Sequence, residues 1–596
     1  MLLGTGDWLI VAGFFVVILS IGVLTSKRAG KNSTEFFLSG RNMPWWLLGV
    51  SMVATTFSTD TPNLVTDLVR NHGVAGNWLW WAFLLTGMLT VFVYAKLWRR
   101  SKVMTDIEFY EIRYSGKTAA FLRGFRALYL GVFFNVMIMA TVSLAAIKIG
   151  GVLLNLSPLQ TIAVAMLVTV IYTGLGGLRS VLATDFFLFS FAMFGAVIAA
   201  VVAVGLPEVN GLGNLFSHPN VVGKLNLLPD FSDPSSFLPI LVIPVAVQWW
   251  SVWYPGAEPG GGGYLVQRML SAKNEKNAMG ATLFFNAAHY ALRPWPWIIV
   301  ALASLIIYPD LSQLAEKFPH VDPNIVKNDL AYPAMLTFLP RGILGIVVAS
   351  LVAAYMSTMA SHLNWGSSYV VNDFYKRFLR PNASDKQQVT VGRISTVVLM
   401  ILAGAIALLL QNALQAFHIL LQIGAGTGLI FILRWFWWRI NALTEITGMI
   451  VSFLVAFYLE ILHVKFGFQP LPEYVNLLIG VSITTVSWLT VTFLTRPASD
   501  EKLRTFYNLV RPGGPGWNKM LKKFEQQGNP VPETATKGDL PLGILCMVVG
   551  CLAVYSAVFA AGFYLYSNIV PGVIATIIAA GSIFFLVRTW GTLEMK

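Results

Sequence analysis

Apolar runs long enough to cross a membrane recur along almost the whole chain. Of its 596 residues, 56% are hydrophobic and only 12% are charged, whereas a soluble domain carries about a quarter charged residues. An α-helix of about 20 apolar residues crosses the hydrocarbon layer of a bilayer. The sequence therefore predicts an all-α polytopic membrane protein with about 15 transmembrane helices. The expected spans are 6–25, 44–69, 77–97, 126–150, 158–176, 182–205, 238–266, 278–308, 342–370, 388–411, 414–433, 442–463, 473–494, 541–563 and 566–588.

The net charge of +13 is concentrated in alternate connections between these runs. Cytoplasmic loops of membrane proteins carry such a basic excess, so the charge does not indicate a nucleic-acid partner. We expect the N-terminus outside, the C-terminus in the cytoplasm, and a plasma membrane as the location, most simply a bacterial inner membrane. The first span has no basic segment before it and no cleavage site, which predicts a retained helix. The basic connections are 27–41, 96–126, 268–276, 376–393, 434–439 and 495–540.

Two of the expected spans are interrupted. Residues 51–62 combine several hydroxyl side chains with Asp60 and Pro62, and residues 249–264 combine tryptophans with prolines and glycines. Polar groups at that depth are costly in lipid, so they normally face a cavity or bind a ligand. Matched broken helices in two halves of a chain mark the binding site of a secondary transporter. Each interrupted span opens a group of five spans, and the second group must run opposite to the first because five is odd.

This organisation predicts seven segments. Residues 495–540 are rich in proline and glycine, and we expect a solvated cytoplasmic linker there, with an amphipathic helix over 517–524 as the alternative. The segments are 1–43 (peripheral helix and inner loop), 44–205 (first five-helix repeat), 206–237 (outer loop), 238–433 (second five-helix repeat), 434–494 (peripheral helices), 495–540 (linker) and 541–596 (peripheral helices).

Four stretches resemble the sodium/solute symporter family, in the expected order and spacing. The resemblance covers roughly residues 1–430. It implies a LeuT-type fold with a 5+5 inverted-repeat core, and alternating access driven by a sodium gradient, as in the sodium-coupled galactose, proline and sialic acid transporters. The stretches are Phe36 to Trp46; Gly176 to Val181 with Thr184-Asp185; Gln267-Arg268 with Ala272-Lys273; and Ser357 to Asn364 with Asp373 to Tyr375.

The resemblance also implies a sodium site between two spans. Its ligands would be the carbonyls of Ala54, Phe57 and Ala354 and the hydroxyls of Ser357 and Thr358. An unwound helix offers carbonyl oxygens that no longer bond within the helix. The residues alone agree in part, because hydroxyls at 357, 358 and 361 can point from one helical face toward a neighbouring span. The alternative is an ordinary helix interface, where Ser and Thr are common.

Some relatives use an acid at the position of Asp185 for a second sodium. That site would also take oxygens from positions 357, 360 and 361, where this chain has Ser357, Ala360 and Ser361. Ala360 has no side-chain oxygen, which favours one sodium per cycle. Asp185 alone is also consistent with a gate, a proton carrier or a helix N-terminal acid.

The substrate site is expected between the two interruptions. Aromatic rings stack on sugar faces and carboxylates accept hydroxyl bonds, so Trp253 and Glu258 favour a sugar; an interfacial aromatic belt is the alternative. Arg293, four residues after His289, must pair in the membrane, either with Glu258 or Asp60 or with a substrate carboxylate. The candidate substrate-binding residues are Thr56, Ser58, Asp60, Thr61, Gln248, Trp253, Glu258, His289 and Arg293.

These observations predict a sodium-coupled importer of a small polar solute, a sugar or sugar derivative. The alternatives are a proton-coupled or sodium-coupled transporter of an organic carboxylate such as a sugar acid or amino acid, and, less favoured, a symporter-like membrane sensor. No nucleophile–base set or His/Cys metal motif indicates an enzyme, and Cys546 and Cys551 indicate packing rather than a disulfide or metal cluster. We expect sodium as the ion, the lipid bilayer as surroundings and a functional monomer.

Overall fold

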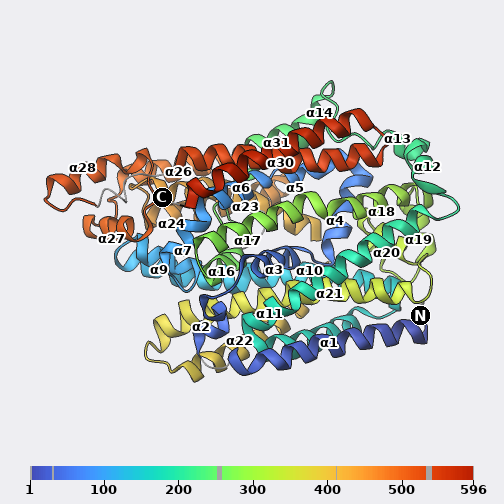
Figure 1. Cartoon of the computed structure of the whole chain (residues 1–596), viewed down its shortest axis with the longest axis horizontal. Helices are drawn as coiled ribbons and strands as arrows, with labels where there is room; N and C mark the ends of the chain where they lie inside the picture. The colour runs from blue at the N-terminus through green and yellow to red at the C-terminus, as the bar shows by residue number, and fades with distance from the viewer. Residues whose placement is uncertain (1–2, 30–31, 252–257, 411–412, 532–539, 595–596) are drawn as a thin grey trace.

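The computed structural model describes residues 3–29, 32–251, 258–410, 413–531 and 540–594. Most long helices run along the longest axis of the molecule (Figure 1), and the described residues contain no β-strand. One end carries the N-terminus with α12 (Gly211–Ser217), α13 (Pro219–Val222) and α19 (Leu311–Lys317). The opposite end carries α27 (Asp500–Val510) and α28 (Asn518–Gln526). We call these the α19 end and the α27 end.

The first expected interruption is present. Helix α3 (Trp45–Thr56) stops where Phe57 takes an extended conformation, and α4 (Asp60–His72) starts three residues later with an acid in its first turn. A helix end leaves its last carbonyls without partners inside the helix. Residues 57–59 therefore open the backbone in the middle of the molecule.

The first group of spans continues from there. It contains η2 (Val74–Asn77), α5 (Trp78–Trp81), α6 (Leu84–Leu89), η3 (Thr90–Tyr94), α7 (Ala95–Ser101), η4 (Asp106–Glu108), α8 (Phe109–Arg113), α9 (Gly116–Leu128), η5 (Tyr129–Phe134), α10 (Asn135–Ile149), η6 (Gly150–Leu154) and α11 (Pro158–Val204). It is preceded by α1 (Thr5–Ala29), α2 (Ser33–Leu38) and η1 (Ser39–Arg41).

The second group begins with short pieces of helix. They are α14 (Pro234–Phe237), η7 (Leu238–Val242), α15 (Ile243–Ala246) and η8 (Gln248–Trp250), followed after the break by α16 (Gly263–Ser271). The group continues with α17 (Glu275–Ala287), η9 (Ala288–Leu292), α18 (Pro294–Ile307), η10 (Pro323–Ile325), η11 (Asn328–Leu330), α20 (Ala331–Leu336), α21 (Ile343–Ser368), η12 (Tyr369–Leu379), α22 (Asp385–Ala407) and α23 (Ala413–Phe436).

Helix α11 contains two of the expected spans, 158–176 and 182–205. Its parts Pro158–Leu167 and Leu178–Val204 are apolar as separate segments. A straight helix of this length would be about twice as long as a membrane is thick. The two parts therefore correspond to two spans, and the boundary at Gly176-Gly177 stays a prediction.

Ten helices in the described residues are long and apolar enough to cross a membrane. Five shorter apolar helices lie at the remaining expected spans: Thr5–Ile21, Trp45–Thr56, Pro158–Leu167, Pro234–Ala246 and Gly426–Phe436. The fold class predicted from the sequence is thereby confirmed, while the number fifteen stays a prediction.

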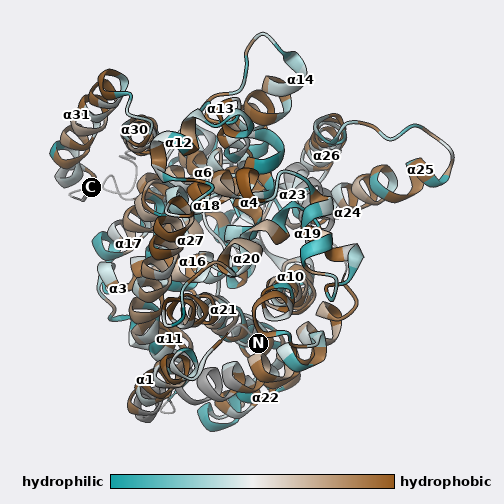
Figure 2. Cartoon of the chain, turned by 90° about the vertical axis from the view of Figure 1, so that its right-hand side faces the viewer, coloured by the Kyte–Doolittle hydropathy of each residue, from teal (hydrophilic) through white to brown (hydrophobic). Residues whose placement is uncertain are grey.

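Two groups of peripheral helices flank the core. Viewed from the α19 end (Figure 2), α30 (Leu540–Leu565) and α31 (Ile569–Glu594) lie on one side, and α24 (Ala442–Phe457), α25 (His463–Lys465) and α26 (Glu473–Leu494) lie on another. The connection η13 (Tyr458–Leu462) joins α24 to α25. Both cysteines, Cys546 and Cys551, are buried in α30 and unoxidised.

The segment 495–540 is not the solvated tether that its composition suggests. Its described part forms α27, η14 (Pro515–Trp517) and α28, which pack against the α27 end of the core. Trp517 is fully buried, and its indole N–H donates to the carbonyl of Trp435 at 2.8 Å. Arg113 lies over the rings of Phe506 and Trp517. Aromatic burial of this kind outweighs the turn-forming composition, because each such ring buries about 150–250 Å².

Candidate functional site

The end of α3 is held against α21 by hydrogen bonds of hydroxyl groups. Thr358 donates to the carbonyl of Thr55 at 2.8 Å and points to the carbonyl of Phe57 at 3.5 Å. Ala54, Phe57, Ala354, Ser357 and Thr358 are all at most 2% exposed. The end of α3 and the neighbouring part of α21 therefore meet at one buried point, where a carbonyl of the ended helix accepts from a hydroxyl of the neighbouring span.

Asp185 of α11 lies beside the same point and is fully buried. Ser357 donates to its Oδ1 at 2.7 Å, and Ser51 of α3 donates to its Oδ2. A buried carboxylate needs hydrogen bonds and a positive partner to offset the loss of water. The two serines supply the hydrogen bonds and join three helices at one carboxylate.

The positive charge next to Asp185 comes from Arg268 of α16. Its guanidinium lies 4.0 Å from the carboxylate and donates to Ser361 at 2.6 Å, to Ser51 at 3.2 Å and to Thr55 at 3.3 Å. Asp185, Ser361 and neighbouring hydroxyls form the set that the resemblance assigns to a second cation. In this structure that set is bound to a fully buried arginine side chain.

A second polar group lies on the other side of α3. Thr56 hydrogen-bonds His289 Nδ1 at 3.1 Å, and Arg293 donates to Thr56 at 3.3 Å and meets His289 Nε2 at 3.2 Å. The guanidinium of Arg293 lies over the ring of Trp297. His289 belongs to η9, a π-helical turn, and widened turns of this kind often occur at functional sites. The structure therefore brings together three of the residues predicted to bind substrate.

The start of α4 adds further polar groups. Ser58 donates its backbone N–H to the Thr61 hydroxyl at 3.3 Å. Asp60 Oδ1, both amide atoms of Asn63 and the hydroxyl of Thr66 are buried without a hydrogen-bond partner among the described residues. The side chains of Asp60, Asn63 and Thr66 are spaced by three residues and share one helical face. Buried polar atoms are normally paired, so this face is suited to hydrogen bonds with a polar solute.

Arg293 makes no ion pair with Glu258 or Asp60 within 4 Å in the described part of the chain. Glu258 instead pairs with Arg126 and, at 3.6 Å, with Arg434. Gln248 is buried and donates to the carbonyl of Leu79 at 2.8 Å. Trp253 lies outside the described residues.

Glu258 belongs to a buried ionic and aromatic cluster toward the α27 end. Arg434 also lies 3.6 Å from Glu445, and Tyr114 donates to Glu445 at 2.5 Å. The guanidinium groups of Arg126 and Arg434 both lie over the ring of Phe431. This cluster joins the region of the second interruption to α9, α23 and α24, and it closes the core on that side.

Polar contacts also join the helices toward the α19 end. Arg70 of α4 donates to the carbonyls of Ser304 and Tyr308 at 3.1 and 2.8 Å, and Lys148 pairs with Asp329 at 2.6 Å. Helices of both five-span groups are thus held together at both ends of the polar region.

Sequence reasoning missed five residues of this region, Ser51, Thr55, Asn63, Thr66 and Arg268. Arg268 was read only as part of a family motif, and Ser51 and Thr55 only as hydroxyls in an interruption. Asn63 had a usable signal, because a polar side chain three residues after Asp60 lies on the same helical face. No local signal places Arg268 next to Asp185, since the two positions are far apart in the chain.

The comparisons with known proteins identify the family. A sequence profile of the sodium:solute symporter family matches residues 36–452. The chain belongs to this family. The resemblance inferred from the four sequence stretches is confirmed, and the protein is a membrane transporter rather than an enzyme.

Curated members of the family are similar over most of their length. The chain is 26% identical to a sodium/glucose cotransporter of Vibrio parahaemolyticus over 81% of this symporter and 90% of the relative. It is 28% identical to sodium/myo-inositol cotransporter 2 of Oryctolagus cuniculus over 84% and 78% of the two chains.

The fold is also found in a solved structure. The outward-open, substrate-bound state of a Na⁺-coupled sialic acid symporter superposes with a TM-score of 0.66 at 21% identity, over 83% of this symporter and 99% of that chain. This likeness supports the expected LeuT-type inverted-repeat core.

Proposed function

We propose that this symporter carries a sugar or sugar derivative together with sodium by alternating access. The observation that supports it best is the break between α3 and α4, where buried carbonyls face the Thr358 hydroxyl of α21 at 2.8 Å. Interrupted helices with exposed carbonyls form ion sites in secondary transporters. The names of the relatives, glucose and myo-inositol cotransporters, favour a polyhydroxylated solute.

Sodium would bind at the break as a co-substrate. Its proposed ligands are the carbonyls of Ala54, Phe57 and Ala354 and the hydroxyls of Ser357 and Thr358. Hard oxygen ligands of this kind suit a small hard cation. A sodium ion there would join α3 to α21 and bind the carbonyl of Phe57, which follows the last turn of α3.

We propose one sodium per cycle. Asp185 and Ser361, the candidates for a second cation, already contact the positive charge of Arg268. A second cation next to that guanidinium would meet strong repulsion in a medium of low dielectric constant. Arg268 would therefore act as a permanent counter-charge where some relatives use an ion.

The solute would bind between α3, α4 and η9. We assign the contacts to Thr56, Ser58, Asp60, Thr61, His289 and Arg293, and add Asn63 and Thr66. For Gln248 the amide donor is already used by Leu79. Trp253 stays a prediction. We assign Glu258 to closure of the core toward the α27 end, because it is paired with two arginines.

Solute and sodium would act on the same segment from two sides. Thr55 and Thr56, adjacent at the end of α3, contact the proposed sodium region and the proposed solute region respectively. Each ligand then stabilises the arrangement that the other needs, which is positive coupling between two sites.

An acidic sugar or another organic carboxylate is the second candidate. The guanidinium of Arg293 is 1% exposed and has no ion-pair partner among the described residues. A buried charge without a partner is costly, and a substrate carboxylate would compensate it.

The test is the thermal stability of the purified full-length protein with neutral sugars, polyols, sugar acids and amino acids, each in sodium and in potassium salt. A ligand at 100 times its dissociation constant stabilises by about 2.7 kcal/mol. We expect a neutral sugar or polyol to raise the melting temperature only in sodium. A shift by sugar acids alone identifies the second candidate. Equal shifts in both salts contradict sodium coupling and support a proton-coupled carrier or a sensor.

We also propose that the α19 end faces outward and the α27 end faces the cytoplasm of a plasma membrane, and that the protomer works as a monomer. The basic connections at the α27 end support this orientation.

A further inference from the structure

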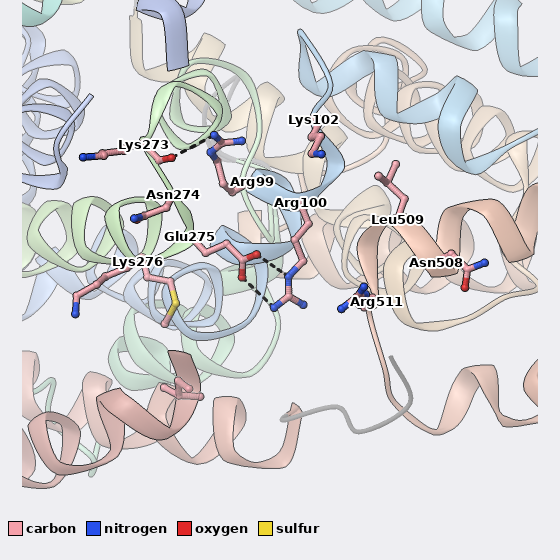
Figure 3. Close-up of a pocket in the computed structure, with 12 residues that line it drawn as sticks. Arg99, Arg100, Lys102, Lys273, Asn274, Glu275, Lys276, Asn508, Leu509 and Arg511 are labelled. Carbon is pink, nitrogen blue, oxygen red and sulfur yellow. Dashed lines mark hydrogen bonds and ion pairs between the residues drawn. The ribbon is translucent and has the colours of Figure 1, made fainter. Parts of the chain in front are cut away.

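A cavity of about 870 Å³ opens at the α27 end, away from the proposed sodium and solute sites (Figure 3). It is bounded by the end of α7, the connection from α16 to α17, the end of α27 and the end of α31. One acid, Glu275, lines it. Six basic residues line it as well: Arg99, Arg100, Lys102, Lys273, Lys276 and Arg511.

The one lining carboxylate, Glu275, already has an ion-pair partner. Glu275 pairs with Arg100 at 2.9 Å. Lys102, Lys273 and Arg511 are exposed and have no ion pair within the described ranges. In Figure 3, Lys102 and Arg511 lie on the same side as Arg100, and the side chain of Lys273 extends away from them. Lys102 and Arg511 therefore add unpaired positive charge to a cavity in which the one lining carboxylate among the described residues, Glu275, is already paired.

Two of these basic residues occupy unusual backbone positions. Lys102 and Arg511 follow the last turns of α7 and α27 in the left-handed region, with φ of 55° and 54°. Glycine is the usual residue at such a position, since other L-residues pay a steric cost there. A charged side chain at both positions indicates a use for the charge.

The cavity lies at the level where membrane spans end. The spans Val74–Ser101, Glu275–Ile307 and Ile569–Leu593 each contribute an end residue or its neighbours to it. Its wall also includes the apolar side chains of Met279, Leu509 and Leu593. A basic wall beside an apolar wall at the end of a span matches the boundary between lipid headgroups and acyl chains.

We propose that this cavity binds the phosphate-bearing headgroup of an anionic membrane lipid, with the acyl chains leaving along α31. A general basic excess at this end explains charge on the surface, but it does not explain a cavity with an apolar side. A free phosphate compound shares the headgroup chemistry and lacks only the chains, so the experiment separates the two sources.

The test compares phosphatidylglycerol, phosphatidylcholine and soluble glycerol phosphate on the purified full-length protein by native mass spectrometry. The variant Lys102→Gln/Lys273→Gln/Arg511→Gln removes three exposed charges without touching the Arg100–Glu275 pair. The control Arg380→Gln/Lys386→Gln/Lys522→Gln removes three exposed charges at the same end, outside the cavity.

We expect the cavity variant to bind phosphatidylglycerol about a hundredfold more weakly, roughly fivefold for each charge removed. The control variant should bind as the unmodified protein does, and both should keep its melting temperature without lipid. Equal phosphatidylglycerol binding by the two variants overturns the site. Displacement of the lipid by glycerol phosphate at equal concentration overturns the assignment to a lipid.

Discussion

The break between α3 and α4 removes backbone hydrogen bonds, and a side-chain hydroxyl group replaces one of them. The carbonyl of Thr55 accepts from Thr358, and Phe57 N–H still bonds to Val53 at 3.0 Å. The hydroxyl of Thr358 thus donates the hydrogen bond that a backbone N–H of a following helical turn would donate to the Thr55 carbonyl. Removing it leaves a buried carbonyl unpaired and removes one proposed sodium ligand.

Thr358→Val tests this assignment. We expect the sodium concentration for half-maximal uptake to rise about tenfold, because a lost buried hydrogen bond or ligand costs about 1 to 1.5 kcal/mol. Sodium-dependent uptake of the identified solute in proteoliposomes measures it. Ser350→Ala is the matched control on α21, since among the described residues the Ser350 hydroxyl donates to the Val347 carbonyl of the same helix. An unchanged sodium dependence would refute the site.

The pair of Arg268 and Asp185 makes a prediction about stability. Asp185→Asn or Arg268→Gln alone should destabilise by about 3–5 kcal/mol, because each leaves a buried charge without its partner. The double variant should be more stable than the sum of the single effects predicts. Thermal unfolding measures this, with the exposed pair Lys523–Asp500 as control, where the coupling should stay below about 1 kcal/mol. Additive effects at the buried pair would contradict the direct interaction.

Short elements at breaks have a larger effect on the candidate site than the long helices. The π-turn η9 carries His289 and is followed directly by Arg293, and both side chains contact Thr56. Helix α16, at the end of the second interruption, brings Arg268 next to Asp185. Both elements border a place where regular hydrogen bonding stops. Such segments open at lower free energy than packed helices do, which suits parts that move in a transport cycle.

Glu258→Gln tests whether the Glu258–Arg126 pair holds α16 closed against the core. We expect amides of α16 (Gly263–Ser271) to exchange hydrogen about tenfold faster, because the variant leaves the buried guanidinium of Arg126 uncompensated. Hydrogen–deuterium exchange measures it, and Asp500→Asn, which removes an exposed pair, should leave α16 unchanged. Weaker solute binding without faster exchange would instead favour the substrate role predicted from sequence.

Across the whole molecule, polar contacts join the helices on both sides of the candidate site. The Glu258 cluster lies toward the α27 end, and Arg70 and the Lys148–Asp329 pair lie toward the α19 end. A carrier that alternates must break one set at a time, so these contacts set the free energies of the two open states.

The orientation is tested by labelling on intact cells with a membrane-impermeant maleimide. Ser217→Cys, exposed at the α19 end, should label directly, and Lys386→Cys, exposed near the α27 end, only after permeabilisation. Cys546 and Cys551 are at most 5% exposed, so they give a low background. The opposite labelling pattern would reverse the proposed sidedness.

Hydropathy and the four family stretches by themselves determined the fold class, the family and the first interruption. Membrane spans can be predicted from sequence because each of them must be apolar where it crosses the lipid. The sequence also indicated that Ser361 shares a helical face with Ser357 and with Thr358, which lie four and three residues before it.

The tertiary structure alone decided which buried charges meet. Glu258 and Arg126 are 132 positions apart, and Arg268 and Ser361 are 93 apart. No local pattern encodes such pairs, because they depend on how separate helices pack. For the same reason the packing of α27 and α28, whose composition resembles that of a linker, became visible only in the folded chain.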